Sequence, residues 1–330
     1  MSENDQAAQP AQFKDRTAGL VAYGSVEILI GGLCALLIPL MVFAAFIPQP
    51  GGPAVGLRMM LPAVGVYTIA AVFFIWIGVG SILARRWARA VMLICSWLWL
   101  IVGVTAMVGW IWLMPNIFDN MPPGQQVPPG FVLVMQIVMG AITGCIYLVL
   151  PLAFVLFYQS KHVWATCRFR DPKTRWTDRC PLPVLALVIL FAYGAFCMLW
   201  LPFYNCVIPW FGSFLEGPSG AAVVLGVAIL EVYLVWGIYH CRVAAWWTAL
   251  FFVTVGSVSA LLTMAQTDLM ELYQRMGFPE EQLDIMRQTG MVEKMSSAWW
   301  MGIPTIVVFL GYLIYVKRYF GLPENQEQTR

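Results

Sequence analysis

The chain has 330 residues, of which 60% are apolar and only 11% are charged, and its formal net charge is +2. A soluble domain carries roughly 25% charged residues, because its surface must face water. The composition therefore excludes a soluble globular enzyme, a disordered chain and a nucleic-acid-binding module. It indicates a protein that crosses the membrane several times.

A transmembrane helix needs about 20 mostly apolar residues to cross the hydrocarbon core. Eight segments meet this requirement, and their length and uniform apolarity favour helices over the short alternating strands of a β-barrel. The expected spans cover residues 18–47, 60–83, 88–114, 131–158, 182–209, 220–240, 245–265 and 298–316. The sequence thus predicts an all-α, polytopic bundle of about eight transmembrane helices.

Basic residues predict the orientation of this bundle, because cytoplasmic loops carry an excess of lysine and arginine. With the N-terminal tail, residues 1–16, in the cytoplasm, 15 of the 19 basic residues fall inside. The four left outside are Arg58, Arg275, Arg287 and Lys294. An even number of spans returns the tail at 319–330 to the same side. The polar start and the long first apolar run argue against a cleaved signal peptide, so we expect a bacterial-type inner (plasma) membrane protein with both termini cytoplasmic.

The inner loop at residues 159–180 carries six basic and two acidic residues, a net charge of +4. A basic segment beside a membrane attracts anionic lipid headgroups. The residues expected to contact headgroups are Arg168, Arg170, Lys173, Arg175 and Arg179. The loop serves either as such a membrane anchor or as a docking surface for a cytoplasmic protein.

The outer segment at residues 267–296 has the pattern of a short amphipathic helical hairpin. Asp268 suits a helix N-cap, and Glu271 stands three residues later, as in a capping box. Gly277 is expected to end the first helix, and Pro279 to occupy the first position of the second. The hairpin serves either as a lid packed on the bundle or as a surface for a protein partner.

Two halves of four spans, residues 17–158 and 181–318, show signs of an internal repeat. Tyr23 and Gly24 in the first span match Tyr193 and Gly194 in the fifth at an offset of 170 residues. A further pair, Arg86 and Arg242, begins the third and the seventh span. Four spans per half give both halves the same orientation, so the pattern favours a 4+4 parallel repeat with its axis along the membrane normal.

Glu27 and Glu231 are the only acidic residues well inside the expected spans. A charged carboxylate in the hydrocarbon core costs several kcal/mol, so such residues usually face the bundle interior and often have a function. Glu27 shares a helical face with Gly24 and Gly31, where another helix can approach closely. Each glutamate is either a protonated, hydrogen-bonded packing residue or a proton or cation site; tyrosine or serine hydroxyls are candidate partners.

Both histidines and three of the eight cysteines fall on the cytoplasmic side of the predicted topology. These residues are His162, Cys167, Cys180, His240 and Cys241. They supply enough ligands for a tetrahedral zinc ion, but their spacing fits no common zinc pattern. The alternative is that they are ordinary residues at the membrane edge, and no cofactor is predicted. The spacing of the cysteines gives no support for a disulfide framework.

The sequence contains no known catalytic motif. The functional prediction therefore rests on the polar groups of the spans and on the two large loops. Polar groups within the spans are sparse, while the two large loops at 159–180 and 267–296 suit protein partners. We therefore expect a non-enzymatic accessory or interaction subunit of a membrane assembly, with no nucleic-acid partner. The alternatives are a small-solute or ion transporter that uses Glu27 and Glu231, and a membrane enzyme with a metal at the histidine and cysteine cluster.

Overall fold

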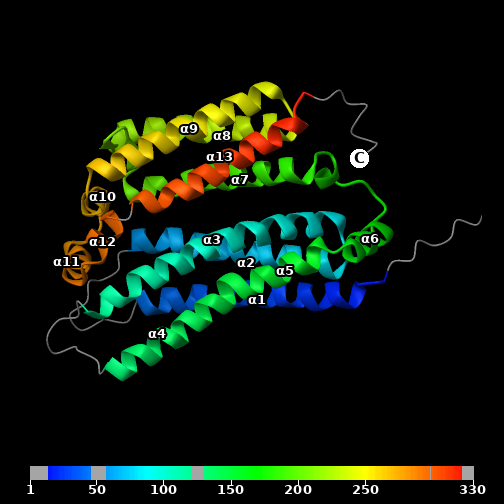
Figure 1. Cartoon of the computed structure of the whole chain (residues 1–330), viewed down its shortest axis with the longest axis horizontal. Coiled ribbons are helices and arrows are strands. Elements are labelled where there is room, and N and C mark those ends of the chain that lie inside the picture. Colours follow the sequence, from blue (N-terminus) through cyan, green and yellow to red (C-terminus); the bar gives the residue numbers. More distant parts are fainter. Residues whose placement is uncertain (1–13, 46–56, 120–128, 298, 322–330) are drawn as a thin grey trace, which may run out of the picture.

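The computed structural model describes residues 14–45, 57–119, 129–297 and 299–321. In these ranges the chain forms a bundle of long helices that run side by side (Figure 1). The first and last described segments lie at the same end of the bundle, which we call the basic end because it carries the residues of the inner loop. The opposite end carries three short helices between residues 269 and 297, and we call it the acidic end.

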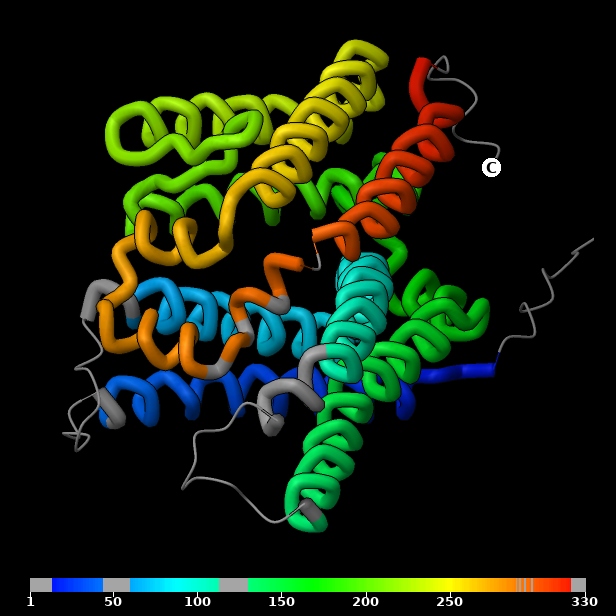
Figure 2. The backbone as a smooth tube through the Cα atoms, turned by 60° about the vertical axis from the view of Figure 1, so that its left-hand side comes forward, coloured from blue at the N-terminus to red at the C-terminus, as the bar shows by residue number. Residues whose placement is uncertain are grey.

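Four helical segments form the first half of the bundle. The helices α1 (Thr17–Ala45) and α2 (Leu57–Ile82) pack extensively on each other, and α3 (Arg86–Asp119) packs on the fourth segment. That segment is interrupted: α4 (Pro129–Gly144) passes through a π-helical turn, η1 (Cys145–Val149), into α5 (Leu150–Gln159). Pro151 lacks the N–H that would bond the carbonyl of Tyr147, which favours a bend here. Consequently α4 diverges from the other helices (Figure 2).

The second half repeats this order of packing. Here α7 (Leu182–Met198) packs on α8 (Gly217–Tyr239), and α9 (Val243–Gln266) packs on α13 (Gly302–Val316), which follows the short turn η4 (Trp299–Met301). The buried apolar side chains form two clusters. One lies in the first half, and the other is centred on the second half but also includes Ala90 and Ile94 of α3. The fold class predicted from the sequence, an all-α membrane bundle, is therefore confirmed.

Seven of the described helices are long and apolar enough to cross a membrane, and α7 is the exception among the eight expected spans. The expected span at 182–209 was too long, because the helix ends at Met198. A short turn, η3 (Leu201–Tyr204), follows it and leads into the strands β1 (Ile208–Trp210) and β2 (Ser213–Leu215), which pair antiparallel. The 17-residue α7 nevertheless lies alongside the long helices (Figure 1).

The turn between α2 and α3 and the turn between α8 and α9 have the same pattern of backbone hydrogen bonds. Ala84 and Cys241 both have positive φ, at 51° and 50°. The next residues, Arg85 and Arg242, donate their N–H groups to the carbonyls of Gly80 at 2.8 Å and Gly237 at 2.9 Å. The offset is 157 residues throughout, so the arginine that corresponds to Arg242 is Arg85 and not Arg86. The duplication and the boundaries of the halves stay predictions.

At the acidic end, the expected two-helix hairpin is instead a run of three short helices. They are α10 (Leu269–Arg275), α11 (Glu280–Thr289) and α12 (Met291–Ser297). Asp268 caps α10 by accepting a hydrogen bond from the N–H of Met270, as predicted, and Gly277 follows its end with a φ of 81°. The predicted capping box does not form, because Glu271 binds Arg275. The left-handed Gly290 separates α11 from α12 and ends the helix that the sequence pattern would continue.

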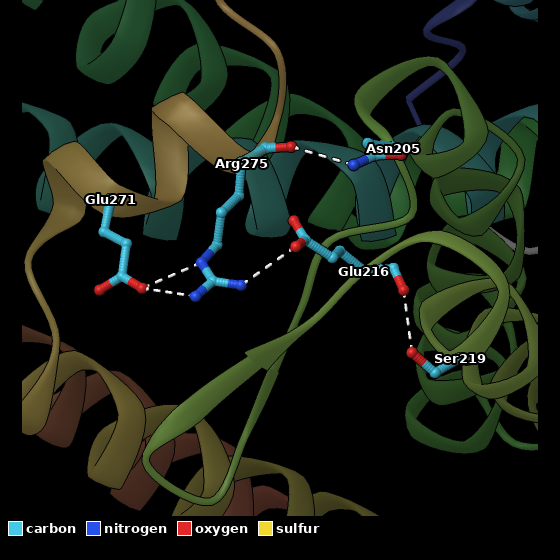
Figure 3. A network of polar contacts seen from close by, with 5 residues as sticks. All are labelled: Asn205, Glu216, Ser219, Glu271 and Arg275. Atoms are coloured by element: carbon cyan, nitrogen blue, oxygen red, sulfur yellow. Dashed lines mark hydrogen bonds and ion pairs between the residues drawn. The ribbon is translucent and has the colours of Figure 1, made fainter.

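Arg275 links these helices to the β-hairpin, as Figure 3 shows. Its guanidinium group binds Glu271 at 2.8 Å and Glu216 at 3.2 Å, while its carbonyl accepts a hydrogen bond from Asn205. The third short helix at this end, α12, packs on α3 of the first half. The acidic end therefore joins the two halves.

Candidate functional site: two intramembrane carboxyl groups

Glu27 lies at the interface of α1 and α2, on the face that the sequence pattern predicted. Gly24 and Gly78 approach so closely that a Cβ atom on either would lie within 2.8 Å of the other's carbonyl oxygen. Gly31 meets the backbone of Ala71 in the same way. This close approach encloses Glu27, whose side chain is 0% exposed.

A third helix supplies the hydrogen-bond partner of Glu27. The Tyr158 hydroxyl, at the end of α5, lies 2.7 Å from Glu27 Oε1 and 2.9 Å from Ser81 Oγ on α2. One hydroxyl proton cannot serve both contacts, so Tyr158 either donates to Glu27 and accepts from Ser81, or donates to Ser81 and accepts from a protonated Glu27. The second carboxyl oxygen, Glu27 Oε2, is buried without a hydrogen-bond partner in the described structure. We call Glu27, Ser81 and Tyr158 the carboxyl triad.

Aromatic rings surround the triad on the α5 side. Tyr23 stacks on Phe157 with 4.0 Å between ring centroids, and it meets Phe154 and Tyr158 edge-on. Phe154 and Tyr158 are both fully buried. The rings fix the Tyr158 hydroxyl in place and separate Glu27 from the surrounding lipid.

Glu231 lies against the neighbouring helix α7. A Cβ atom on Gly194 of α7 would lie 2.5 Å from Glu231 Oε1, so the missing side chain makes the space that the carboxyl occupies. Glu231 is 6% exposed, and its Oε2 atom has no hydrogen-bond partner among the described residues. Gly24 and Gly194, which match in sequence at the offset of 170, thus both face the second helix of their own half.

The structure does not bring the two glutamates together. Glu27 is enclosed by α1, α2 and α5, and Glu231 lies between α7 and α8, on the other side of the bundle (Figure 1). A shared water-filled cavity would favour a transport path that uses both carboxyl groups. Separate positions, each packed against glycine, are instead typical of polar groups that fix helix packing.

The five histidine and cysteine residues proposed as metal ligands are dispersed. Cys167 is buried in the core of the first half and Cys180 in that of the second. His162 Nδ1 accepts a hydrogen bond from the N–H of Lys14, and His240 Nδ1 lies 2.8 Å from the carbonyl of Trp236 in its own helix. Cys241 occupies the left-handed turn after α8. Within the described ranges no group of three or more potential ligands can hold a metal ion.

The inner loop is ordered as α6 (Lys161–Arg170) and η2 (Trp176–Asp178), and its two acidic residues are used internally. Asp171, only 2% exposed, accepts two hydrogen bonds from Arg175 and forms an ion pair with Arg85 at 3.6 Å. Asp178 pairs with Arg86 at 3.2 Å. The hydrogen bonds from Arg175, with further help from Arg86 and Arg85, hold the pKa of Asp171 below its usual value. Arg175, one of the expected headgroup contacts, is therefore bound to an aspartate.

Burial also changes the chemistry of Cys167 in α6. The side chain is 1% exposed, and desolvation raises the pKa of its thiol to about 11. A thiol with this pKa is almost entirely protonated at neutral pH. Cys167 therefore acts as a packing residue beside Arg89 and is not a reactive nucleophile.

Sequence reasoning identified Glu27 and the face on which it lies, but not Tyr158 and Ser81. Both are ordinary residues at span ends, where a tyrosine is typical of the membrane interface. Their contribution depends on which helices meet, and helical periodicity does not contain that information. No protein-family model, curated protein or solved structure matches the chain.

Proposed function

We propose that the chain is a multi-pass membrane subunit without a catalytic site of its own, which acts as an accessory or interaction component of a larger membrane assembly. The supporting observation is the separation of the two intramembrane carboxyl groups, each packed inside its own half. In this proposal the carboxyl groups specify how helices pack, and the ends of the bundle contact partners.

The acidic end offers the more suitable surface for a protein partner. Leu283 anchors α11 to the bundle, since it is 1% exposed, whereas Ile285 on the same helix is 55% exposed. Glu280 and Asp284 both form ion pairs with Arg287, whereas Glu281 has no ion pair in the part of the chain that is described. Ile285 and the carboxylate of Glu281, both exposed on α11, suit a partner that offers an apolar contact beside a basic group.

Native mass spectrometry after mild detergent extraction tests the proposal. We expect the chain in an assembly of defined stoichiometry, and we expect Glu281→Lys to release the partner because it reverses the charge at the contact. Lys173→Glu, at the opposite end, is the matched control and should leave the assembly intact. A lone, monodisperse monomer in every mild extraction would contradict the accessory function.

One observation favours a second candidate, a proton- or cation-coupled transporter. The carboxyl triad gathers three oxygen-bearing side chains, and Glu27 Oε2 has no partner. Buried carboxyl groups of this kind mark proton and ion paths in other membrane proteins. In this second candidate Glu27 is the transport residue, because Glu231 lies in a separate contact between α7 and α8.

Flux in proteoliposomes separates the two candidates. If the chain is a transporter, Glu27→Gln abolishes proton-coupled flux and Glu231→Gln leaves it unchanged. Equal flux in both variants and in the parent protein would remove Glu27 from the path. Absence of flux for every solute tested would leave the accessory function as the better account.

A further inference from the structure

The matched turns of the two halves differ in the group that contacts their arginine side chain. In the first half, Arg85 pairs with Asp171, and its neighbour Arg86 pairs with Asp178. In the second half, Arg242 occupies the position of Arg85 with the same backbone hydrogen bonds. Its guanidinium group lies over the Trp236 ring, 4.0 Å from the centroid, and no described carboxylate pairs with it.

Two more cations lie at the same edge of the second half. Lys317 Nζ is 5.0 Å from the ring centroids of both Trp246 and Trp247. Arg318 lies over Tyr315 at 4.0 Å and donates a hydrogen bond to the Tyr319 hydroxyl at 2.8 Å. As with Arg242, neither has an ion pair within the described ranges. We call Arg242, Lys317 and Arg318 the cation cluster.

Packing between α9 and α13 brings this cluster together. Trp246, 2% exposed, donates its indole N–H to the carbonyl of Leu313 at 2.8 Å. A Cβ atom on Gly321 would lie 3.1 Å from Val243, the residue after Arg242. All three cations are exposed, and they border Trp247, which is itself 54% exposed. The cations are therefore held in place by aromatic rings and open to a ligand.

We propose that the cation cluster binds the phosphate headgroup of an anionic phospholipid. In the first half, Asp171 of the same chain pairs with Arg85 at the matched turn. In the second half, the lipid phosphate takes the corresponding position beside Arg242. Phosphate groups suit arginine and lysine donors, and exposed tryptophan and tyrosine rings suit the depth of lipid headgroups. The acyl chains then lie along the exposed apolar surface of α9 and α13, where Phe251 is 71% and Ile314 is 61% exposed.

This site differs from the headgroup contacts expected in the inner loop. Of those five residues, Arg175 is bound to Asp171, and Arg170 lies 3.6 Å from Asp15. The remaining three are Arg168, Lys173 and Arg179. They carry the same total charge as the cation cluster at the same end of the bundle, so together they make a matched control.

The experiment uses native mass spectrometry of the full chain from nanodiscs that contain phosphatidylglycerol and phosphatidylcholine with identical acyl chains. We expect the parent protein to retain phosphatidylglycerol, and the R242Q/K317Q/R318Q variant to retain roughly tenfold less of it. The R168Q/K173Q/R179Q variant removes the same charge from the inner loop and should lose severalfold less lipid than the cluster variant, since only the cluster forms the proposed site. General electrostatic attraction alone would lower retention in both variants equally. Equal losses, a larger loss in the loop variant, or equal retention of phosphatidylcholine by the parent protein would each overturn the proposal.

A second pair of measurements addresses folding and the chain's own carboxylates. The cluster variant and the loop variant should give the same circular dichroism spectrum and the same thermal midpoint. If the cluster variant unfolds, K317Q/R318Q is compared with R168Q/K173Q, and K317Q/R318Q is expected to retain less phosphatidylglycerol. Glu324 and Glu327 lie in the C-terminal tail. An E324Q/E327Q variant should retain the parental amount of lipid, and a severalfold rise would show that the tail occupies the cluster and would overturn the proposal.

Discussion

Glu27 and Glu231 occupy the same kind of position in sequence, yet their surroundings differ. Both lie well inside an apolar helix, Glu27 on the same face as Gly24 and Gly31, and Glu231 against Gly194 of the neighbouring helix. Glu27 is enclosed by three helices and its Oε1 is bonded to the Tyr158 hydroxyl, whereas Glu231 lies against Gly194 of α7. The Oε2 atom of each carboxyl group has no hydrogen-bond partner in the described structure. The hydroxyl that bonds Glu27 comes from a third helix, α5, so the surroundings of an intramembrane carboxyl depend on which helices meet there.

The fourth segment of each half explains this contrast. In the first half, the π-helical turn and Pro151 redirect the chain, and α5 places Tyr158 beside α1 and α2. In the second half, α13 continues without such a turn and ends near Tyr315, which is 49% exposed and contacts Arg318 instead. Tyr158 is therefore buried and Tyr315 is partly exposed, although both lie near the end of the last span of their half.

The largest effect is expected from Gly24→Ala. Its new methyl group would lie 2.8 Å from the carbonyl of Gly78, so two helix backbones must move apart. We expect the free energy of unfolding, measured by SDS titration in mixed micelles, to fall by about 3 kcal/mol. Gly194→Ala is the control in the other half. It meets only the end of the Glu231 side chain, which can rotate away, so its loss should be less than half as large.

Tyr158→Phe tests the hydrogen bond at the centre of the carboxyl triad. The change keeps the ring and removes the hydroxyl, which leaves the Glu27 carboxyl and the Ser81 hydroxyl buried without their partner. A loss of about 2 kcal/mol in the same titration is expected. Tyr315→Phe provides the comparison, and it should be nearly neutral because that hydroxyl is exposed; equal losses in the two variants would contradict the contrast between the halves.

Asp171→Asn tests the ion pairs that distinguish the basic end of the first half. The pKa of Asp171 is lowered in the folded protein by its bonds to Arg175, so its contribution is present above the unfolded value of about 3.9 and is lost as the pH falls through the folded value. We expect a destabilisation of about 1 kcal/mol at pH 7. The difference in unfolding midpoint from the parent should vanish at a pH below the folded pKa.

Asp284→Asn provides the matched control for that pH series, because Asp284 is exposed on α11 and its ion pair with Arg287 lies in solvent. Exposed pairs contribute little, so its midpoint should follow the parent protein at every pH. An Asp171→Asn difference that persisted unchanged into acid would show that packing, and not the charge of the carboxylate, is responsible.

Glu231→Gln should have the smallest effect on stability. The amide has the same shape as the carboxyl group, and the structure gives Oε2 no hydrogen bond that could be lost. The free energy of unfolding should change by less than about 0.5 kcal/mol. A loss as large as that of Tyr158→Phe would mean that Glu231 has a partner of comparable strength.

The sequence was sufficient to predict the helical bundle and the buried face of α1. Long apolar runs and the spacing of Gly24, Glu27 and Gly31 are local signals, and helical periodicity converts them directly into geometry. The β-hairpin at 208–215 was not predicted, because an apolar run of that length cannot by itself distinguish strand from helix. Gly212, with a φ of 92°, was the local sign of the turn.

The candidate site was less accessible to sequence reasoning than the fold. Glu27 and Glu231 were identified together because acidic residues are rare inside the expected spans. The sequence holds no information on what surrounds either side chain. Whether the two carboxyl groups meet depends on which helices pack together, which only the tertiary structure specifies. The same applies to Asp171, whose bond to Arg175 links residues four apart, while its ion pair with Arg85 spans 86 positions of the chain.

The pairing of Asp171 with Arg85 and of Asp178 with Arg86 has a consequence for biosynthesis. Both acids follow α6 in the chain, whereas Arg85 directly precedes α3 and Arg86 is its first residue. Chains emerge from the ribosome N-terminus first, so these contacts form among residues that have all been made before α7 begins. The first half can close its own basic end while the second half is still being translated, and the order of synthesis then matches the order of assembly.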